Sequence, residues 1–293
     1  MKIHSRGGVG VYADYRENII VDHDHPALAW KANKDRFRPE LFRSAVQAAF
    51  PRGFPRIGSE HSEDALSWNL FRSLQLEKKL ALVGDLAAPR AHFCAVYFWG
   101  RAAHLLSEQV DPEIQDILNE MEPWGKNGAG QQTETDVILR GKAHTIMIEC
   151  KLGKPGETVK AWCRGSEGMR PEYREFLGKL QEQGTTLFSD SFDYDKDANR
   201  VYQLFRNYVL GAALSKKWNA EFSLVAIVNS LNYNLHRRSH DEEFCFFRSL
   251  LRDPSNAFLI TWQQIWDRVR AEPELGDLQT WLLDQPLLRL QAG

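Results

Sequence analysis

TETDVIL at residues 133–139 and TIMIECK at residues 145–151 are the two runs that decide the fold predicted for this chain. Both runs are short and rich in Val, Ile and Thr, and the sequence RGKAH separates them, so each predicts a β-strand and together they predict a hairpin. Alternate side chains of a strand point to opposite faces of the sheet. The second run therefore places Met147, Glu149 and Lys151 on one face.

A hairpin that is symmetric about its connection pairs Arg140 with Thr145 and sets Asp136 directly opposite Glu149. Cross-strand neighbours have Cβ atoms about 4.5–5.5 Å apart, so the two carboxylates repel each other unless a cation lies between them. Oxygen ligands of this kind suit Mg²⁺. Lys151 points its ammonium toward the same place, and we expect it to end its strand at the sheet edge, outside the core. A one-residue shift in register would abolish the pairing, and the connecting sequence does not fix the register.

This pattern resembles the PD-(D/E)xK phosphodiesterase superfamily, which includes many restriction enzymes and repair nucleases. Asp136 matches the aspartate of the hairpin, Glu149-Cys150-Lys151 matches E-x-K, and Thr135 stands where the motif has proline. The resemblance covers about residues 56–232. It implies that Asp136 and Glu149 hold Mg²⁺, with Mn²⁺ as a substitute, and that Lys151 positions or deprotonates the attacking water.

The stretch Ser59–Leu74 is predicted to be a helix, because capping residues precede apolar side chains at helical spacing. The superfamily commonly places a metal-contacting glutamate on the helix before the sheet. Glu63 is the first choice for this catalytic and metal-binding position, and Glu60 is the second. The alternative is that these acidic residues only complement the helix dipole.

A second helix is predicted at Arg200–Leu214, followed by a buried strand at Phe222–Val228. Helix then strand after the hairpin matches the core order of the superfamily, whose second core helix often carries a glutamine near the active site. The resemblance therefore suggests Gln203 as a catalytic residue, with Arg206 and Asn207 as DNA contacts. The alternative is that all three belong to the solvated face of a core helix.

The composition is that of a globular protein, with 43% hydrophobic and 26% charged residues among 293. The chain has no apolar run of about 20 residues and no signal-peptide pattern at its first residues, so we expect a cytoplasmic protein. The net charge of −2 does not indicate a partner, because a DNA enzyme needs only a local basic surface. Candidate basic patches are Lys78–Lys79, Lys216–Lys217, residues 236–238, and the arginines at positions 36, 38, 43, 52 and 56.

These observations predict an α/β fold with a central mixed β-sheet flanked by helices in the order αβββαβ. Residues 1–55 are expected to form an N-terminal extension, residues 56–240 the nuclease-like core with inserted helices, and residues 241–293 a helical tail packed on the core. The predicted function is Mg²⁺-dependent hydrolysis of DNA in restriction, defence or repair. RNA as a substrate and a homodimer both remain open. The alternative is a catalytically silent nucleic-acid-binding or oligomerising module of the same fold.

Overall fold

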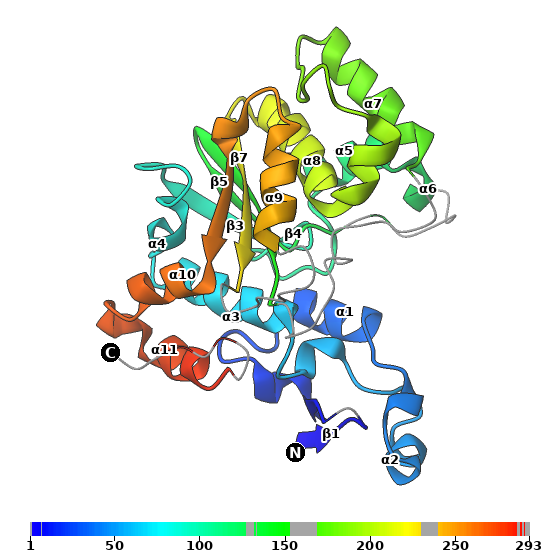
Figure 1. Cartoon of the computed structure of the whole chain (residues 1–293). Helices are drawn as coiled ribbons and strands as arrows, with labels where there is room; N and C mark the ends of the chain where they lie inside the picture. The colour runs from blue at the N-terminus through cyan, green and yellow to red at the C-terminus, as the bar shows by residue number, and fades with distance from the viewer. Residues whose placement is uncertain are drawn as a thin grey trace.

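A single mixed sheet of six strands, in the order β4-β3-β5-β6-β7-β8, forms the centre of the computed structural model (Figure 1). The structure describes residues 2–6, 8–126, 132, 134–152, 169–229, 240–285, 288 and 290. Neighbours from β4 to β6 are antiparallel, whereas β6, β7 and β8 run parallel. The strands are β3 (Phe93–Phe98), β4 (Arg101–Ala102), β5 (Val137–Gly141), β6 (His144–Cys150), β7 (Glu221–Val228) and β8 (Ala257–Thr261). The predicted α/β class with a mixed sheet is confirmed.

The hairpin of β5 and β6 has the predicted register. Val137 pairs with Ile148, and Arg140 pairs with Thr145. Asp136 directly precedes β5, so the register brings it level with Glu149 at one end of the sheet. A slip of one residue would have moved every side chain of one strand to the other face.

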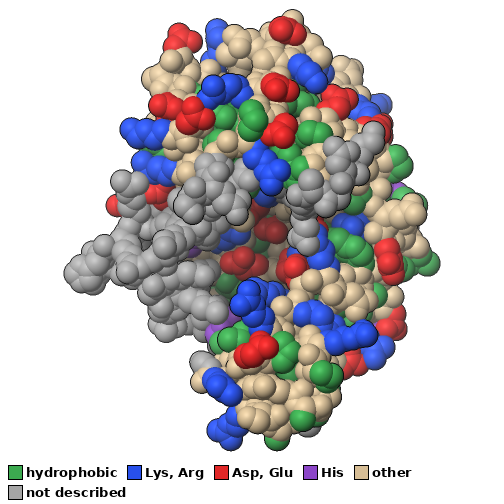
Figure 2. Space-filling view, turned by 90° about the vertical axis from the view of Figure 1, so that its right-hand side faces the viewer, with side chains coloured by type: hydrophobic (Ala, Val, Ile, Leu, Met, Phe, Trp, Pro, Cys, Tyr) green, Lys and Arg blue, Asp and Glu red, His purple; other side chains and the backbone are tan. Residues whose placement is uncertain are grey.

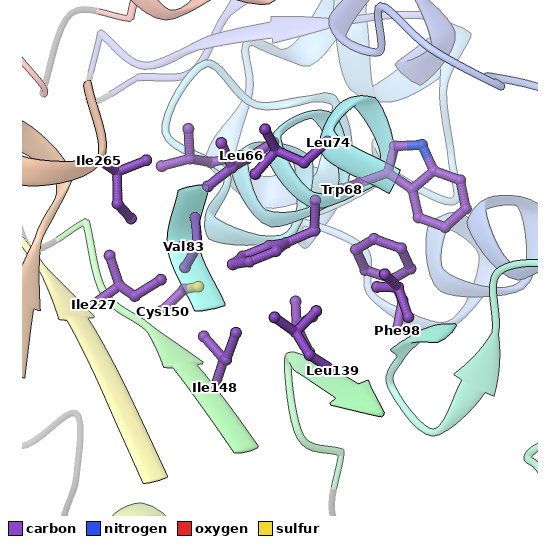
Figure 3. Packing of buried hydrophobic residues seen from close by; sticks show 14 of the residues in the cluster. Leu66, Trp68, Leu74, Val83, Phe98, Leu139, Ile148, Cys150, Ile227 and Ile265 are labelled. Atoms are coloured by element: carbon purple, nitrogen blue, oxygen red, sulfur yellow. The ribbon is translucent and has the colours of Figure 1, made fainter. Parts of the chain in front are cut away.

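Helices cover both faces of the sheet, and the two faces bury different sets of apolar side chains (Figure 1). Ile148 and Cys150 lie in one cluster with Trp68 and Ile265 (Figure 3), whereas Met147 lies in the cluster on the other face. This alternation is the one predicted for the second run. The helices are α1 (Pro26–Lys34), α2 (Ser44–Ala49), α3 (Glu63–Leu76), α4 (Ala81–Gly84), α5 (Pro112–Met121), α6 (Pro123–Lys126), α7 (Pro171–Glu182), α8 (Tyr202–Trp218), α9 (His240–Ser249), α10 (Trp262–Val269) and α11 (Gly276–Leu283).

The core therefore follows the order α3, β3, β5, β6, α8, β7, which is the predicted αβββαβ order with α5 and α6 inserted before the hairpin and α7 after it. Within the described ranges, no helix has the length and apolar character needed to cross a bilayer.

The first 62 residues contribute a helix that the sequence did not lead us to expect. Pro26 opens α1, where proline is well tolerated, and the Nδ1 atom of His25 caps the helix by accepting the Ala27 N–H at 3.1 Å. Leu28 and Ala32 of α1 are buried in the same cluster as the sheet and α3. A small ladder of β1 (Lys2–His4) with β2 (Gly10–Tyr12) precedes α1.

The expectation of a purely helical tail is wrong for Ala257–Thr261, which forms β8 and extends the sheet beside β7. The run is only five residues long, and it becomes a strand because β7 offers a free parallel edge. Its end leads directly into α10 through a capping box formed by Thr261 and Gln264.

Candidate active site

Acidic and basic side chains meet where β6 ends and β5 begins. Glu149 is almost fully buried, and each of its carboxylate oxygens has a donor. The Nζ atom of Lys151 donates to Oε1 at 2.7 Å, and the Nδ2 atom of Asn207 donates to Oε2 at 2.7 Å. The carboxylate is thereby fixed in place by one charged and one neutral donor.

Lys151 is buried, with 7% of its surface exposed. The sequence-based expectation that it ends its strand outside the core is wrong, because β6 lies between β5 and β7 and not at an edge. Its backbone is held on both sides: its N–H donates to the carbonyl of Ile227 at 2.7 Å, and its carbonyl accepts the Trp262 Nε1–H at 3.1 Å. Burial alone would lower the pKa of Lys151, but the charges of the nearby carboxylates outweigh burial and raise it.

Asp136 lies beside this pair, and its Oδ2 atom accepts the backbone N–H of Cys150 at 2.8 Å. Burial, followed by the negative charge of Glu149, raises the pKa of Asp136 well above its ordinary value, and Lys151 only partly opposes this. Burial, the largest cause, and the neighbouring carboxylate therefore both disfavour the charged form of Asp136.

Glu63 reaches the same cluster from the first turn of α3. The Ser62 hydroxyl caps this helix by accepting the Ala65 N–H. The Oε1 atom of Glu63 accepts the Leu152 N–H at 2.8 Å, and its Oε2 atom lies 3.7 Å from the Lys151 ammonium. Burial raises the pKa of Glu63. Although Glu63 could complement the helix dipole as well, its carboxylate is bonded to the strand that carries Glu149 and Lys151.

Glu60, the second choice for the upstream carboxylate, points elsewhere. Its Oε1 atom accepts the Gly10 N–H at 2.8 Å, and its Oε2 atom pairs with Lys2. The structure therefore brings Glu63 to the cluster and uses Glu60 to hold the N-terminal ladder.

Helix α8 supplies an amide to the site, but the residue is Asn207 and not Gln203. The Oδ1 atom of Asn207 accepts from Thr135 Oγ1 at 3.0 Å, so its Nδ2 faces Glu149. Gln203 lies one turn earlier, and its Oε1 atom is buried without a hydrogen-bond partner among the described residues. A Cβ at Gly211 would lie 2.6 Å from the Met147 side chain, so a glycine there lets α8 approach β6 closely enough for Asn207 to reach Glu149.

Arg206, expected to contact DNA, is buried beneath the site. Its Nη2 atom donates to the Glu134 carbonyl and to Asn207 Oδ1, both at 3.3 Å. With 7% of its surface exposed, it supports the chain that leads into Asp136 and holds Asn207, a placement that sequence periodicity alone did not distinguish from a solvated helix face.

A second charged group, which the sequence reasoning missed, adjoins the cluster. The Nζ atom of Lys31, on α1, lies 2.7 Å from Asp35, 3.1 Å from Glu134 and 3.3 Å from Asp64. Lys34 also pairs with Glu134. Because Asp64 follows Glu63 and Glu134 precedes Asp136 by two residues, one buried ammonium connects the two segments that carry these carboxylates. Pro26 is a local signal for the start of this helix, but the distant partners of Lys31 could not be read from sequence.

The donor chemistry of Asp136 and Glu149 fits Mg²⁺ or Mn²⁺, because both side chains offer hard carboxylate oxygens and the charge of Lys151 only partly offsets burial and Glu149 at Asp136. The side chains that the structure describes do not, however, form a complete set of ligands for such an ion. Among the described residues, no three His, Cys, Asp or Glu side chains are arranged to hold a metal ion. Each oxygen of Glu149 already accepts one hydrogen bond, from Lys151 or from Asn207, which leaves each a second lone pair for an ion.

A hollow of about 790 Å³ lies at the other end of the hairpin, lined by residues that include Ala143, His144 and Glu221. His144 begins β6 and Cys150 ends it, which separates the hollow from the carboxylates by about 20 Å of extended strand. The hollow is therefore distinct from the cluster.

Asp136, Glu149 and Lys151 lie in the part of the chain that matches a known family. The sequence pattern of the family described as restriction endonuclease associating with ARP matches residues 91–285. The chain belongs to this family. The matched part includes Asp136, Glu149 and Lys151 but not Glu63 or Lys31. The predicted restriction-endonuclease-like relationship is confirmed. No curated protein and no solved structure gives a significant match.

Proposed function

We propose that this protein is a metal-dependent nuclease that hydrolyses phosphodiester bonds of DNA. The observation that carries the proposal is the joining of Asp136, Glu149 and Lys151 at one end of the sheet in a member of a restriction-endonuclease family. Restriction, defence and repair all use this chemistry, and RNA stays open as an alternative substrate.

Asp136 and Glu149 would hold Mg²⁺ or Mn²⁺, with Glu63 as a third carboxylate beside them. A bound divalent cation would supply charge neutralisation at the phosphoryl oxygen and lower the pKa of water. Every other contribution comes from the side chains described above.

Lys151 would act as a cation and not as a base. Its raised pKa keeps the ammonium protonated, so it would neutralise charge on the pentavalent phosphorus. The proton of the attacking water then needs another acceptor, and we assign it to Glu63. This carboxylate is the more open of the two that flank Lys151, with 36% of its side chain exposed against 3% for Glu149, and its raised pKa suits a general base.

The rival function is a catalytically silent nucleic-acid-binding module. It is favoured by the absence, within the described residues, of three metal-ligand side chains arranged around one point. The two proposals differ in whether divalent cations bind at Asp136 and whether DNA is cut.

Cleavage of plasmid and single-stranded DNA with Mg²⁺ and with Mn²⁺ tests the proposal. Asp136→Asn and Lys151→Met should each lower the rate at least about 10²-fold, the scale of a lost group that stabilises developing charge. Asp116→Asn is the matched control, because Asp116 forms an exposed pair with Lys217. Calorimetry should show weaker Mn²⁺ binding to Asp136→Asn than to wild type. Uncut DNA with both ions, together with equal Mn²⁺ affinity in the two proteins, would establish the silent module instead.

A further inference from the structure

A basic segment adjoins the acidic cluster. We call residues 34–56 the arm; it carries six Lys or Arg residues and two acidic ones, in a chain whose net charge is −2. The arm starts at Lys34, which pairs with Glu134 beside the active site. Figure 1 shows α2, within the arm, projecting from the body of the molecule beyond α1.

The arm is ordered by its own contacts. Its two ends run side by side: the Phe37 N–H donates to the Phe54 carbonyl and the Arg56 N–H to the Asp35 carbonyl, both at 2.8 Å. Phe42 and Phe54 are buried against each other, with ring centroids 4.8 Å apart. The basic side chains are thus displayed on a folded support.

Among the described residues, the arginines of the arm have no acidic partner. Arg36 donates to the backbone carbonyls of Ala32, Arg52 and Gly53, and its pKa is lowered by burial and then by the charge of Arg52. Arg56 lies over the Phe37 ring, 5.3 Å from its centroid. In the part of the chain that the structure describes, no carboxylate lies within ion-pair distance of Arg38, Arg43 or Arg52, and all three are exposed.

Several basic residues elsewhere form ion pairs, whereas the arm gathers five arginines without one among the described residues. Arg72 pairs with Asp22, and Arg200 pairs with Glu243. In two of the other basic patches predicted from sequence, one lysine forms an ion pair: Lys79 with Glu272, and Lys217 with Asp116. The third, residues 236–238, lies outside the described residues. Uncompensated positive charge held on a rigid support is a surface suited to a polyanion.

We propose that the arm binds the phosphate backbone of a DNA duplex beside the scissile phosphate. The choice of DNA rests on the proposed function. From Lys34 to Arg38 the chain spans at most about 14 Å, which corresponds to about four base-pair steps along the duplex axis. Because Lys34 pairs with Glu134, two residues before Asp136, the arm begins beside the carboxylates and Arg38 follows within this span. Figure 2 shows acidic side chains in a hollow, with Lys and Arg side chains on its rim.

The residue type supports phosphate as the ligand. Beyond Lys34, every basic residue of the arm is arginine. The guanidinium fork donates two parallel hydrogen bonds to a phosphate and holds its charge at any accessible pH. Contacts of this kind position a duplex without reading its sequence.

Fluorescence anisotropy with a 30-base-pair duplex in the presence of a chelator, across a range of salt concentrations, tests the inference independently of cleavage. The triple variant Arg38→Gln, Arg43→Gln, Arg52→Gln should reduce the slope of log affinity against log salt by about 2 to 3, because each lost phosphate contact removes about 0.9. Its affinity at low salt should fall on the order of tenfold or more, while its melting temperature stays that of wild type.

Arg16→Gln is the matched control, because Arg16 is also exposed but pairs with Asp14; it should leave the salt slope unchanged. An unchanged slope in the triple variant would overturn the inference, as would a loss of single-stranded RNA binding with duplex binding intact. If the arm is required for duplex binding but no DNA is cut with Mg²⁺ or Mn²⁺, the proposed nuclease activity fails and the interface stands.

Discussion

The part of the chain that matches the family pattern and the part that precedes it contribute differently to the same site. Residues 91–285 supply Asp136, Glu149 and Lys151. The preceding residues supply Glu63, bonded to the backbone of Leu152, and Lys31. The matched part thus supplies the central carboxylates, while the earlier part supplies a further carboxylate and a buried ammonium beside them.

Packing joins the two parts as closely as the charges do. Leu28 of α1 and Trp68 of α3 are fully buried in the cluster that includes Phe98 of β3 and Ile148 of β6 (Figure 3). A family boundary drawn on sequence similarity therefore passes through a continuous core and through the site itself. Substitutions in the unmatched part measure how much the site depends on it.

Removing the buried ammonium of Lys31 should have the largest effect. Lys31→Met leaves three carboxylates without their shared cation, and breaking a buried ion pair typically costs about 3–5 kcal/mol of unfolding free energy. The matched control is Lys217→Met, whose exposed pair with Asp116 is worth about 0.2–1 kcal/mol. Urea unfolding of both variants measures the difference. Similar small losses of unfolding free energy in the two variants would show that the ion pairs of Lys31 contribute little to stability.

Glu63→Gln should come next, with cleavage lowered about 10²- to 10³-fold, or about 2.7–4 kcal/mol in activation free energy. The amide keeps an oxygen that can accept the Leu152 N–H, so stability should change little. Glu60→Gln is the control, since Glu60 bonds Gly10 and Lys2 instead. Steady-state cleavage assays decide between them, and loss of activity in Glu60→Gln alone would place the reactive carboxylate one turn away from where we assign it.

The smallest effect concerns pH. Asp136, buried and beside Glu149, has a raised pKa in the folded protein, so the folded state binds its proton more tightly than the unfolded state does. This stabilisation is complete below the ordinary carboxyl pKa of about 4 and is lost as pH rises through the folded value. In a chelator, the melting temperature of wild type should therefore fall from pH 5 to pH 8 by about 2–4 °C more than that of Asp136→Asn.

Other groups titrate in the same range, which is why the comparison with Asp136→Asn is needed. Burial lowers the pKa of His25 and of His144, so their contribution to stability is lost toward low pH, opposite in sign to that of Asp136. Both proteins contain these histidines, and the difference between the two calorimetric profiles isolates Asp136. If the melting temperatures of the two proteins change with pH in parallel, the pKa of Asp136 is not raised in the folded protein.

The features that the sequence predicted are those set by neighbours in the chain. Alternation within residues 145–151 predicted the two faces of β6, and the assumption of a symmetric connection gave the register with β5 that the structure has. The coarse order of helices and strands followed from the same local periodicities. The hairpin pattern therefore placed Asp136, Glu149 and Lys151 near one another, whereas Glu63 was assigned only through the resemblance to the superfamily.

What could not be predicted depends on distant packing. The burial of Lys151 follows from β7 lying beside β6, and β8 exists as a strand because β7 has a free edge. Selecting Asn207 over Gln203 required the rotation of α8, which Gly211 and the sheet determine together. The partners of Lys31 lie up to 103 residues away in sequence.

That last separation has a consequence for the nascent chain. At a synthesis rate of about 5–20 residues per second, Lys31 leaves the ribosome roughly 5–20 s before Glu134. Lys31 consequently lacks its partner Glu134 during this interval, and Glu63 likewise lacks Leu152, 89 residues later in the chain. The cluster of opposed charges can therefore assemble only after the chain has been made to Leu152, about half of its 293 residues. A chain made only as far as β5 carries Asp136 without Lys151, and Asn207, the second donor to Glu149, follows later still on α8.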